Sequence, residues 1–508
     1  MAYLFRLQVN SLITALLICT MTNDSNANTL EVGQGYPYAT LSEATDIVVP
    51  GDTILIHEGT YSGGIFVADL QGMPGTWIHI LAASGETVIF DGGSNAWQFT
   101  DAAYLEIRGI IFEHQTGNGV NFDDGGSYET PAHHILFDQC TFRDINATGN
   151  NDLLKLSGLD SFEIRNCLFL NGAEGGSGID MVGCHDGQIH NNHFEDLGSN
   201  SVQAKGGCRN IRIERNFFKN GGARALNLGG STGLQFFRPL DAPYEAAELK
   251  VYSNVFIGSD APVAFVGTIN TEVVNNTFYL PTKWVLRILQ ETVDPERFPP
   301  CGYNTFRNNI IYIDNLVSVE CNIGPNTAPE TFTFSNNLWF HSEDSNWPGP
   351  DLPATDADQI IGENPLFTDV AIEDFTLMEG SPAIGAGYDV LDPLIDFIGI
   401  PFLSSRSTGA LEGGMTTSVY DADSYDSEDM RVWPNPADDE INIAFPFPQR
   451  DVKFLLYSIT GQTLMSITND SLNNRSKFIL PLPSNLHGVY VLRIEGHDFK
   501  KSEVIVIN

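Results

Sequence analysis

Basic residues are scarce in this 508-residue sequence, where 26 lysines and arginines stand against 64 acidic residues and give a formal net charge of −38. A surface of that sign repels phosphate backbones and anionic lipids, so nucleic acid and anionic membranes are not expected partners. The charge is equally unfavourable for a polyanionic ligand. Any acidic substrate therefore needs a local cluster of basic side chains.

Long apolar runs are also missing. Residues 12–19 are too few to span a bilayer, and no later stretch approaches the ~18 continuous apolar residues that would. With Arg6 before this run and Ser25 and Ala27 after it, the N-terminus predicts a secretory signal peptide, residues 1–27. The mature protein is expected to be exported, without a membrane span, and monomeric.

Zinc-type spacings of cysteine and histidine are absent as well. Cys19 leaves with the signal peptide, and the other six cysteines form pairs about one repeat apart. These pairs are Cys140 and Cys167, Cys184 and Cys208, and Cys301 and Cys321. Export permits disulfides, yet stacked inward thiols are also ordinary core residues, so the sequence leaves the disulfide state open.

What the sequence does contain is a repeat. Within residues 177–230, Cys184 and Asn192 recur 24 residues later as Cys208 and Asn216. Each unit has a short alternating strand ending in glycine, a second strand and an Asn-x-Phe turn. Such a unit cannot bury its apolar face alone and must stack on copies of itself. The stack is a parallel β-helix, in which equivalent positions of neighbouring coils lie about 4.8 Å apart.

Asparagines mark the coil corners along most of the chain. Asparagine tolerates the left-handed backbone of a tight corner, and its side chain can bond its neighbours along the stack. We therefore predict a structural ladder of asparagines at positions 166, 192, 216, 254, 276, 309 and 337. Two intervals, 216–254 and 276–309, exceed one coil and predict inserted loops, which in solenoids usually line the binding face.

Both ends of the predicted helix contain familiar phrases. Residues 29–61 predict a strand, a helix with Leu41, Ala44 and Ile47 on one face, and a second strand. This segment, with PGTWIHILAASGETVIFDGG after it, resembles the N-terminal cap and first coil of right-handed parallel β-helix proteins of the pectate lyase and chondroitinase B types. The phrase DFTLMEGSPAIGAG resembles their C-terminal ending. We predict an all-β, pectin lyase-like β-helix over residues 28–415.

The C-terminal region is different in composition. Residues 416–429 form an acidic linker, and residues 430–508 alternate as a small β-sandwich domain. Its PNPA, ITGQ and GVYVLRI phrases resemble the type A C-terminal sorting domain of the type IX secretion system of Bacteroidetes. The resemblance implies passage through the periplasm, export by the type IX machinery, removal of the domain, and release or surface anchoring.

Polar residues converge on one predicted sheet. Aligning the strands at 153–158, 178–183, 201–206 and 225–230 sends their alternate apolar residues inward. The outward row is Lys155, Asp180, Gln203 and Asn227, with Lys205 in the row beside it. Arg224 precedes the last of these strands, and the loop 231–249, which carries Arg238, follows it. Polar groups gathered beneath an insertion are the best candidate site in the sequence.

This set suits β-elimination of a uronic acid. The carboxylate must be neutralised, a base must take the C5 proton, and the bond to O4 then breaks. We expect Lys205 to be the base, since two nearby arginines and partial burial favour the neutral amine. Arg224 and Arg238 are expected to bind the carboxylate, because a guanidinium binds it bidentately. Lys155, Gln203 and Asn227 complete the predicted substrate site.

The same residues carry a second resemblance, to β-helix polysaccharide lyases of the chondroitinase B and alginate lyase type. In these families a lysine on the parallel sheet is the base and an arginine about one coil later assists, and Lys205 and Arg224 occupy matching places. The Asn-Lys-Ser and Arg-His-Gly phrases of the chondroitinase B type are absent, so the subfamily and the polysaccharide stay open. The resemblance also implies calcium, with Asp180 and either Glu195 or Glu174 as candidate ligands.

Two other functions stay open. A glycoside hydrolase on this fold needs two carboxylates about 5 to 9 Å apart, for which Asp180 and either Asp123 or Asp124 are candidates. A non-catalytic glycan-binding or adhesive β-helix would instead present stacked aromatic residues on an exposed face, whereas the rows placed here are polar and charged.

Overall fold

The computed structural model describes residues 27–413 and seven strands between residues 431 and 507. The chain forms two compact units, residues 1–415 and 416–508. The predicted signal peptide lies outside the described residues except for Ala27, and the predicted linker lies outside them entirely. None of the helices in the described part has the length and hydropathy needed to cross a membrane.

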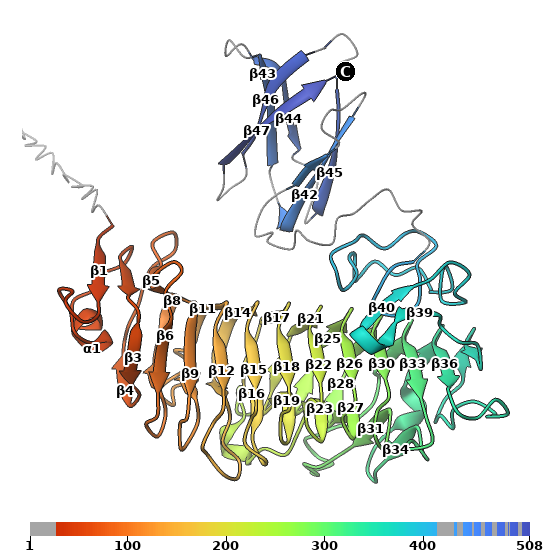
Figure 1. The fold of residues 1–508 in the computed structure, drawn as a ribbon. Helices are drawn as coiled ribbons and strands as arrows, with labels where there is room; N and C mark the ends of the chain where they lie inside the picture. Colours follow the sequence, from red (N-terminus) through yellow and green to blue (C-terminus); the bar gives the residue numbers. More distant parts are fainter. Residues whose placement is uncertain are drawn as a thin grey trace, which may run out of the picture. The chain divides into compact units, whose positions relative to one another are not determined.

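The first unit is a parallel β-helix, as predicted (Figure 1). Its coils contribute strands to three long parallel sheets. The thirteen-stranded sheet contains β1 (Thr29–Val32), β2 (Thr53–Ile56), β5 (Ile78–Ala82), β8 (Ala103–Arg108), β11 (Ala132–Asp138), β14 (Leu159–Arg165), β17 (Gln188–His190), β21 (Arg212–Glu214), β25 (Lys250–Tyr252), β29 (Glu272–Val274), β32 (Thr305–Arg307), β35 (Thr333–Ser335) and β37 (Asp356–Ala357).

The twelve-stranded sheet contains β3 (Gly59–Ser62), β6 (Val88–Asp91), β9 (Ile110–Glu113), β12 (Thr141–Arg143), β15 (Leu168–Leu170), β18 (His193–Glu195), β22 (Phe217–Lys219), β26 (Val255–Ile257), β30 (Thr277–Tyr279), β33 (Ile310–Ile313), β36 (Leu338–His341) and β38 (Ile360–Ile361). The ten-stranded sheet contains β4 (Ile65–Ala68), β7 (Trp97–Thr100), β10 (Val120–Asp123), β13 (Leu154–Ser157), β16 (Ser177–Val182), β19 (Asn200–Lys205), β23 (Arg224–Gly229), β27 (Ala261–Val266), β31 (Leu286–Leu289) and β34 (Cys321–Ile323).

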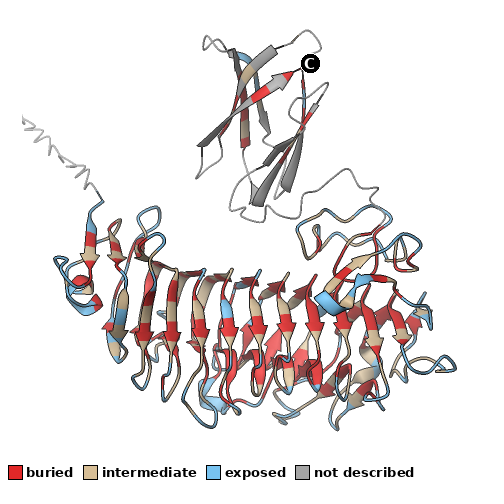
Figure 2. Cartoon of the chain, viewed as in Figure 1, coloured by how far each residue is buried: buried red, intermediate tan, exposed pale blue. Residues whose placement is uncertain are grey.

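The core fills the inside of the coil, where alternate strand residues are buried (Figure 2). One phenylalanine per coil lies above the next, with ring centroids 4.7 to 4.9 Å apart from Phe142 to Phe278. This spacing equals the distance between neighbouring parallel strands. Residues at equivalent positions of successive repeats therefore pack directly on one another along the helix axis. All six cysteines described lie in this interior and are free.

The asparagine ladder is present, with one correction. From Asn192 to Asn309, each ladder backbone N–H donates to the side-chain oxygen of the asparagine one coil on, at 2.9 to 3.0 Å. Asn166 is outside the ladder, because the N–H of Cys167 is the group that donates to Asn192. The left-handed backbone also belongs to the residue before each ladder position, such as Arg215 or Ser253, and not to the ladder asparagines.

The helix in the N-terminal cap is shorter than predicted. Helix α1 (Leu41–Thr45) begins after Thr40, whose hydroxyl accepts a hydrogen bond from the Glu43 N–H, and it buries Leu41 and Ala44. Ile47 lies beyond the end of the helix and is exposed, so its placement on the buried face is wrong.

At one corner of the coil, β20 (Cys208–Arg209), β24 (Ala246–Ala247) and β28 (Thr268–Ile269) form a short additional sheet.

Both long intervals are inserted loops, as predicted. The first insertion, residues 230–249, follows β23 and holds a short 3-10 helix, η1 (Leu234–Phe236), and β24. The second insertion, residues 290–304, follows β31. Both therefore leave from the same end of strands in the ten-stranded sheet.

The closing segment follows β38. It contains the antiparallel pair β39 (Phe367–Asp369) and β40 (Asp374–Leu377) and a 3-10 helix, η3 (Val370–Ile372). A further 3-10 helix, η2 (Pro329–Thr331), precedes β35.

The second unit consists of two antiparallel sheets. One contains β41 (Arg431–Trp433), β42 (Glu440–Gln449) and β45 (Arg475–Pro481), and the other β43 (Val452–Ser458), β44 (Thr463–Asn469), β46 (Gly488–Glu495) and β47 (Lys500–Ile507). Residues from both sheets, including Ile443 and Leu492, share one buried apolar cluster. The predicted small β-sandwich is confirmed.

Candidate functional site

The outward row on the ten-stranded sheet has the predicted register. Lys155 on β13 pairs with Asp180 on β16, which pairs with Gln203 on β19, which pairs with Asn227 on β23. The inward residues of these strands are fully buried. With Lys205 and Arg224, these four residues form what we call the candidate site.

Asp180 is the centre of the candidate site. Its side chain is 1% exposed and lies between two ammonium groups, those of Lys155 on its Oδ2 and Lys205 on its Oδ1, the latter at 3.1 Å. Burial by itself lowers the pKa of Lys155, but the charges of Asp180 and Asp152 outweigh burial and raise it. A carboxylate that is buried this deeply is stable only with such partners.

Lys205 has a different charge environment from the one expected. Its Nζ contacts Asp180 and donates to Oε1 of Gln203 at 2.9 Å. The predicted surrounding by two arginines is therefore wrong, because the charged partner of Lys205 is a carboxylate. Gly230 lies against this side chain: a Cβ there would be 3.2 Å from Cδ of Lys205. The first insertion thus covers one side of the lysine.

Arg224 is on the adjacent strand. Its Nη1 donates to Oδ1 of Asn227 at 3.0 Å, and its Nη2 pairs with Glu291 of the second insertion at 2.9 Å. The guanidinium therefore remains on the outward face, one strand from Lys205. Its side chain is 21% exposed, so a ligand can reach it.

Arg238 is not part of the candidate site. Both its terminal nitrogens pair with Asp160, at 2.6 and 2.7 Å, and Nη1 also donates to the Gly183 carbonyl. Burial by itself raises the pKa of Asp160, but the hydrogen bonds from Arg238 and His185 hold it well below its usual range. The predicted contact of Arg238 with substrate is not supported by this placement, since the buried guanidinium is already bound bidentately and ties the first insertion to the coil.

The calcium ligands expected from the sequence do not fit a metal. Asp180 is on the ten-stranded sheet facing two ammonium groups, whereas Glu195 is on β18 of the twelve-stranded sheet and pairs with His193 and Lys219. Glu174 lies in the loop before β16, and no contact links it to Asp180 among the described residues. We therefore assign no calcium site to these residues.

A different group of candidate metal ligands lies elsewhere. Single ligand atoms of Asp91, Glu113 and His114 all lie within 4.8 Å of one another. They belong to the twelve-stranded sheet and its corner, and Arg143 also pairs with Glu113. A guanidinium at that position competes with a cation, so this group is an acidic cluster away from the candidate site.

The hydrolase pair expected from the sequence is not assembled either. Asp123 is two strands from Asp180 and accepts a hydrogen bond from Gln98. Asp124 is buried at a corner and accepts the Gly126 N–H. Burial raises the pKa of Asp124. Because Asp180 is held by two lysines and Asp124 holds a turn, neither is free to act as the second carboxylate.

Sequence analysis missed Asp152. This residue precedes β13, its Oδ1 accepts the Ser177 N–H at 2.8 Å, and its Oδ2 lies 3.6 Å from Nζ of Lys155. Burial, and then the negative charge of Asp180, raise the pKa of Asp152 to about 6. In the sequence, Asp152 stands directly before Leu153 and Leu154, which are both buried. This position at the start of a strand could have placed it at the edge of the same sheet.

The titration of Asp152 gives a prediction for stability. Its pKa in the folded protein is above the unfolded value, so the folded state binds more protons between about pH 4 and 6 and stability falls as pH rises through that window. Asp152→Asn should remove this part of the pH dependence. Chemical denaturation at pH 4.5 and 7 measures it, and an unchanged slope in the variant would contradict the assignment.

Glu245 was also missed. It is 0% exposed, yet its carboxylate accepts from the Gly206 and Thr232 N–H groups, both at 2.9 Å, from the Thr232 hydroxyl at 2.7 Å, and from the Thr292 hydroxyl. These donors come from the residue after Lys205, from the first insertion and from the second. Glu245 therefore joins both insertions to the corner that follows Lys205, a role that only the folded chain reveals.

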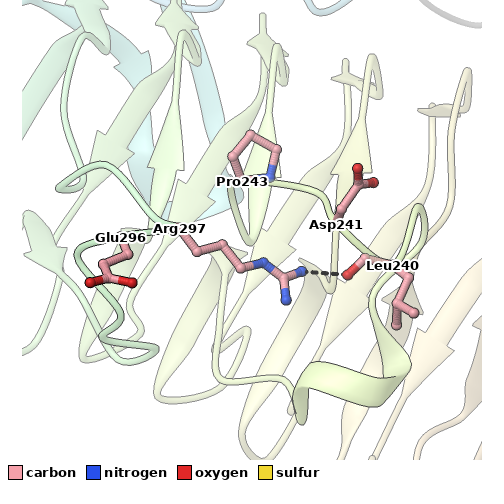
Figure 3. A pocket seen from close by; sticks show the side chains of 5 residues that line it. All are labelled: Leu240, Asp241, Pro243, Glu296 and Arg297. Atoms are coloured by element: carbon pink, nitrogen blue, oxygen red, sulfur yellow. Dashed lines mark hydrogen bonds between the residues drawn. The ribbon is translucent and has the colours of Figure 1, made fainter.

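The two insertions also meet at Arg297. Its Nε donates to the Ala242 carbonyl at 3.0 Å and its Nη2 to the Leu240 carbonyl at 2.8 Å. Beside it lies a hollow of about 650 Å³ lined by Leu240, Asp241, Pro243, Glu296 and Arg297 (Figure 3). Arg297 thus joins the second insertion to the first by hydrogen bonds. None of the candidate site residues lines the hollow.

Comparisons with known proteins agree with this fold. Residues 86–278 match the family described as "Right handed beta helix region", and residues 431–508 match the "Secretion system C-terminal sorting domain". The search of curated proteins finds no match.

Among solved structures, the pectate lyase Pel9A has 14% identity and a TM-score of 0.51, covering 77% of this chain and 97% of that one. A complex of XylC with xylose has 11% identity and a TM-score of 0.42, covering 76% of this chain and 99% of that one. The polysaccharide lyase Pedsa3628 of the PL6 family from Pseudopedobacter saltans has 13% identity and a TM-score of 0.39, covering 72% and 100%.

At these identities the likeness shows the fold alone, while the sorting domain indicates type IX secretion to the cell surface or beyond. The chain is a right-handed parallel β-helix protein with a secretion system C-terminal sorting domain.

Proposed function

We propose that this protein is a secreted polysaccharide lyase that cleaves a uronic-acid-containing polysaccharide by β-elimination. The observation that carries the proposal is the arrangement of Lys205, Asp180 and Arg224 on adjacent strands of the sheet from which both insertions leave the coil. The chain carries a net charge of −38, yet Lys155, Lys205 and Arg224 lie on neighbouring strands here. Such a local cluster of basic side chains is needed to bind a polyanion. The pectate lyase Pel9A, which has the same fold, supports this choice.

In the proposed reaction, Arg224 faces the uronate carboxylate and its positive charge makes the C5 proton acidic. Lys205, as the neutral amine, takes that proton, the C5–H electron pair forms the C4=C5 double bond, and the bond between C4 and its oxygen substituent breaks. The departing oxygen keeps the electron pair of that bond and takes a proton from water. The ammonium so produced is stabilised by Asp180 at 3.1 Å and by Gln203 at 2.9 Å. The same contacts hold the ammonium in the free chain, so Lys205 must release its own proton to solvent before it can take the one from C5.

Asp180 thus has a different role from metal ligation. It orients the lysine and is itself held by Lys155. The Lys155 ammonium is held by Asp180 and Asp152, so we place Lys155 among the supporting residues. Gln203 and Asn227 are buried, and they support Lys205 and Arg224 through hydrogen bonds. Two ammonium groups occupy the Asp180 carboxylate, so no step is assigned to a metal.

The test is an absorbance assay at 235 nm with alginate, pectate, glycosaminoglycans and ulvan, because elimination produces an unsaturated uronate. We expect absorbance to rise with at least one polymer. Products that form without absorbance would identify a hydrolase. Binding without any product would identify a non-catalytic glycan-binding β-helix.

The sorting domain gives a separate prediction. Deleting residues 430–508 should leave the β-helix folded and active but retained in the periplasm, because the two units are separately compact. Activity in periplasmic and external fractions of a type IX-competent host measures this, with the full-length chain as control. Export of the truncated chain at the full-length level would contradict it.

A further inference from the structure

The outward face of β27 is unusually small. Ala261 pairs with Arg224 on one side, and Ala264 lies between Asn227 on β23 and Arg287 on β31. Both alanines are fully buried, and Ala264 lies on the outward side because its neighbours Val263 and Phe265 face the core. The longer side chains of the neighbouring strands therefore close over β27, and Arg224 and Arg287 flank this alanine strip.

Arg287 is held in place without a carboxylate partner. Its Nε donates to Oδ1 of Asn322 at 3.0 Å, and its guanidinium lies 4.4 Å from the ring centroid of Trp284. Within residues 27–413, no carboxylate oxygen forms an ion pair with it. Burial, and then the positive charge of Arg224, lower its pKa. An aligned, half-buried guanidinium facing a second one is an arrangement that an anion stabilises.

Glu291 pairs with Arg224, and its charge also acts on Arg287 without an ion pair to it. It contacts Arg224 at 2.9 Å, and the side chains are 34% and 21% exposed. An ion pair this exposed contributes little to stability. A ligand carboxylate can therefore take its place at little cost.

We propose that Arg287, resting on Trp284, binds the carboxylate of a second uronate residue of the polysaccharide, beyond the residue whose carboxylate Arg224 binds. Glu291 occupies part of this subsite in the free chain. The polymer would then run across the strands from Lys205 on β19 towards β31. Arg224 and Arg287 stand two strands apart, or about 10 Å along the stack. This inference rests on the proposed function for the identity of the ligand.

Calorimetric titration of full-length Lys205→Ala protein tests the subsite, because that variant should bind without turnover. The probes are tetramers and dimers of galacturonate and of alginate, with carboxyl-reduced tetramers for comparison. Adding Arg287→Ala should weaken tetramer binding about 10-fold or more, the usual contribution of a charge-assisted pair, and leave dimer binding nearly unchanged. Glu291→Gln should tighten tetramer binding.

The matched control is Arg143→Ala, which makes the same change in net charge on the twelve-stranded sheet. It should leave binding within twofold. The inference is overturned if Arg287→Ala binds the tetramers as tightly as its parent, if it weakens reduced and acidic tetramers equally, or if none of the acidic oligomers binds. A wild-type chain that binds them and yields no 235 nm product would overturn the lyase proposal while leaving the subsite standing.

Discussion

Replacing Lys205 by alanine is expected to lower kcat about 10²-fold or more, the usual worth of a positioned general base. The side chain points outward, so its loss should leave the coil folded, but it leaves the buried Asp180 carboxylate with Lys155 as its remaining ammonium partner and should lower the melting temperature. Steady-state rates at 235 nm on the polymer found active, together with a thermal melt, measure both effects. Near-wild-type turnover in Lys205→Ala would show that the base has been misplaced.

Lys205→Arg separates chemistry from charge. An arginine can keep the contact with Asp180 but is not deprotonated in proteins, so it cannot take the C5 proton. We expect this variant to bind polymer and remain as inactive as the alanine variant. Lys219→Ala, on the twelve-stranded sheet, removes the same charge far from the candidate site and should retain full activity.

Replacing Glu245 by alanine should have the largest effect on the loops around the candidate site. Four donors would lose a fully buried partner, and unsatisfied buried groups cost about 1–3 kcal/mol each before relaxation. We expect local opening of the first insertion to become easier by roughly 3 kcal/mol. Hydrogen exchange of the Arg238 and Ala242 amides, which donate to Gly206 and Pro239, measures that opening.

The control for this prediction is Glu129→Ala, since Glu129 is exposed and its removal should leave both exchange rates unchanged. Glu245→Gln should be intermediate, because its amide keeps one accepting oxygen but turns an NH₂ group towards two of the donors. Unchanged exchange in Glu245→Ala would mean that the insertions are held by other contacts, such as those of Arg297.

The coil register was predictable because repetition and strand alternation are local properties of the sequence. The row of Lys155, Asp180, Gln203 and Asn227 follows from aligning each strand on its final glycine. The ladder was misaligned only at Asn166, where Cys167 occupies the equivalent position without an asparagine side chain. A search for asparagines alone misses this coil, because the backbone geometry of the ladder continues at Cys167 although the residue there is not asparagine.

The contacts of the insertions were not predictable in the same way. Arg238 lies near Lys205 in the sequence pattern, yet the loop folds so that it meets Asp160, 78 residues away. Glu245 and Thr292 likewise meet only because two loops from different coils converge. Asp180 and Glu195 were paired because the resemblance to lyase families implied calcium, although the two residues lie on different sheets of the coil. Such non-local choices depend on packing that no repeat encodes.

Elimination, as opposed to hydrolysis, is most directly tested by digesting the active polymer in ¹⁸O-labelled water and weighing the oligosaccharide products by mass spectrometry. Elimination adds no water, so we predict unlabelled products with an unsaturated end, each lighter by one water than a hydrolysis product. Products that carry ¹⁸O at the newly formed end would contradict the β-elimination mechanism.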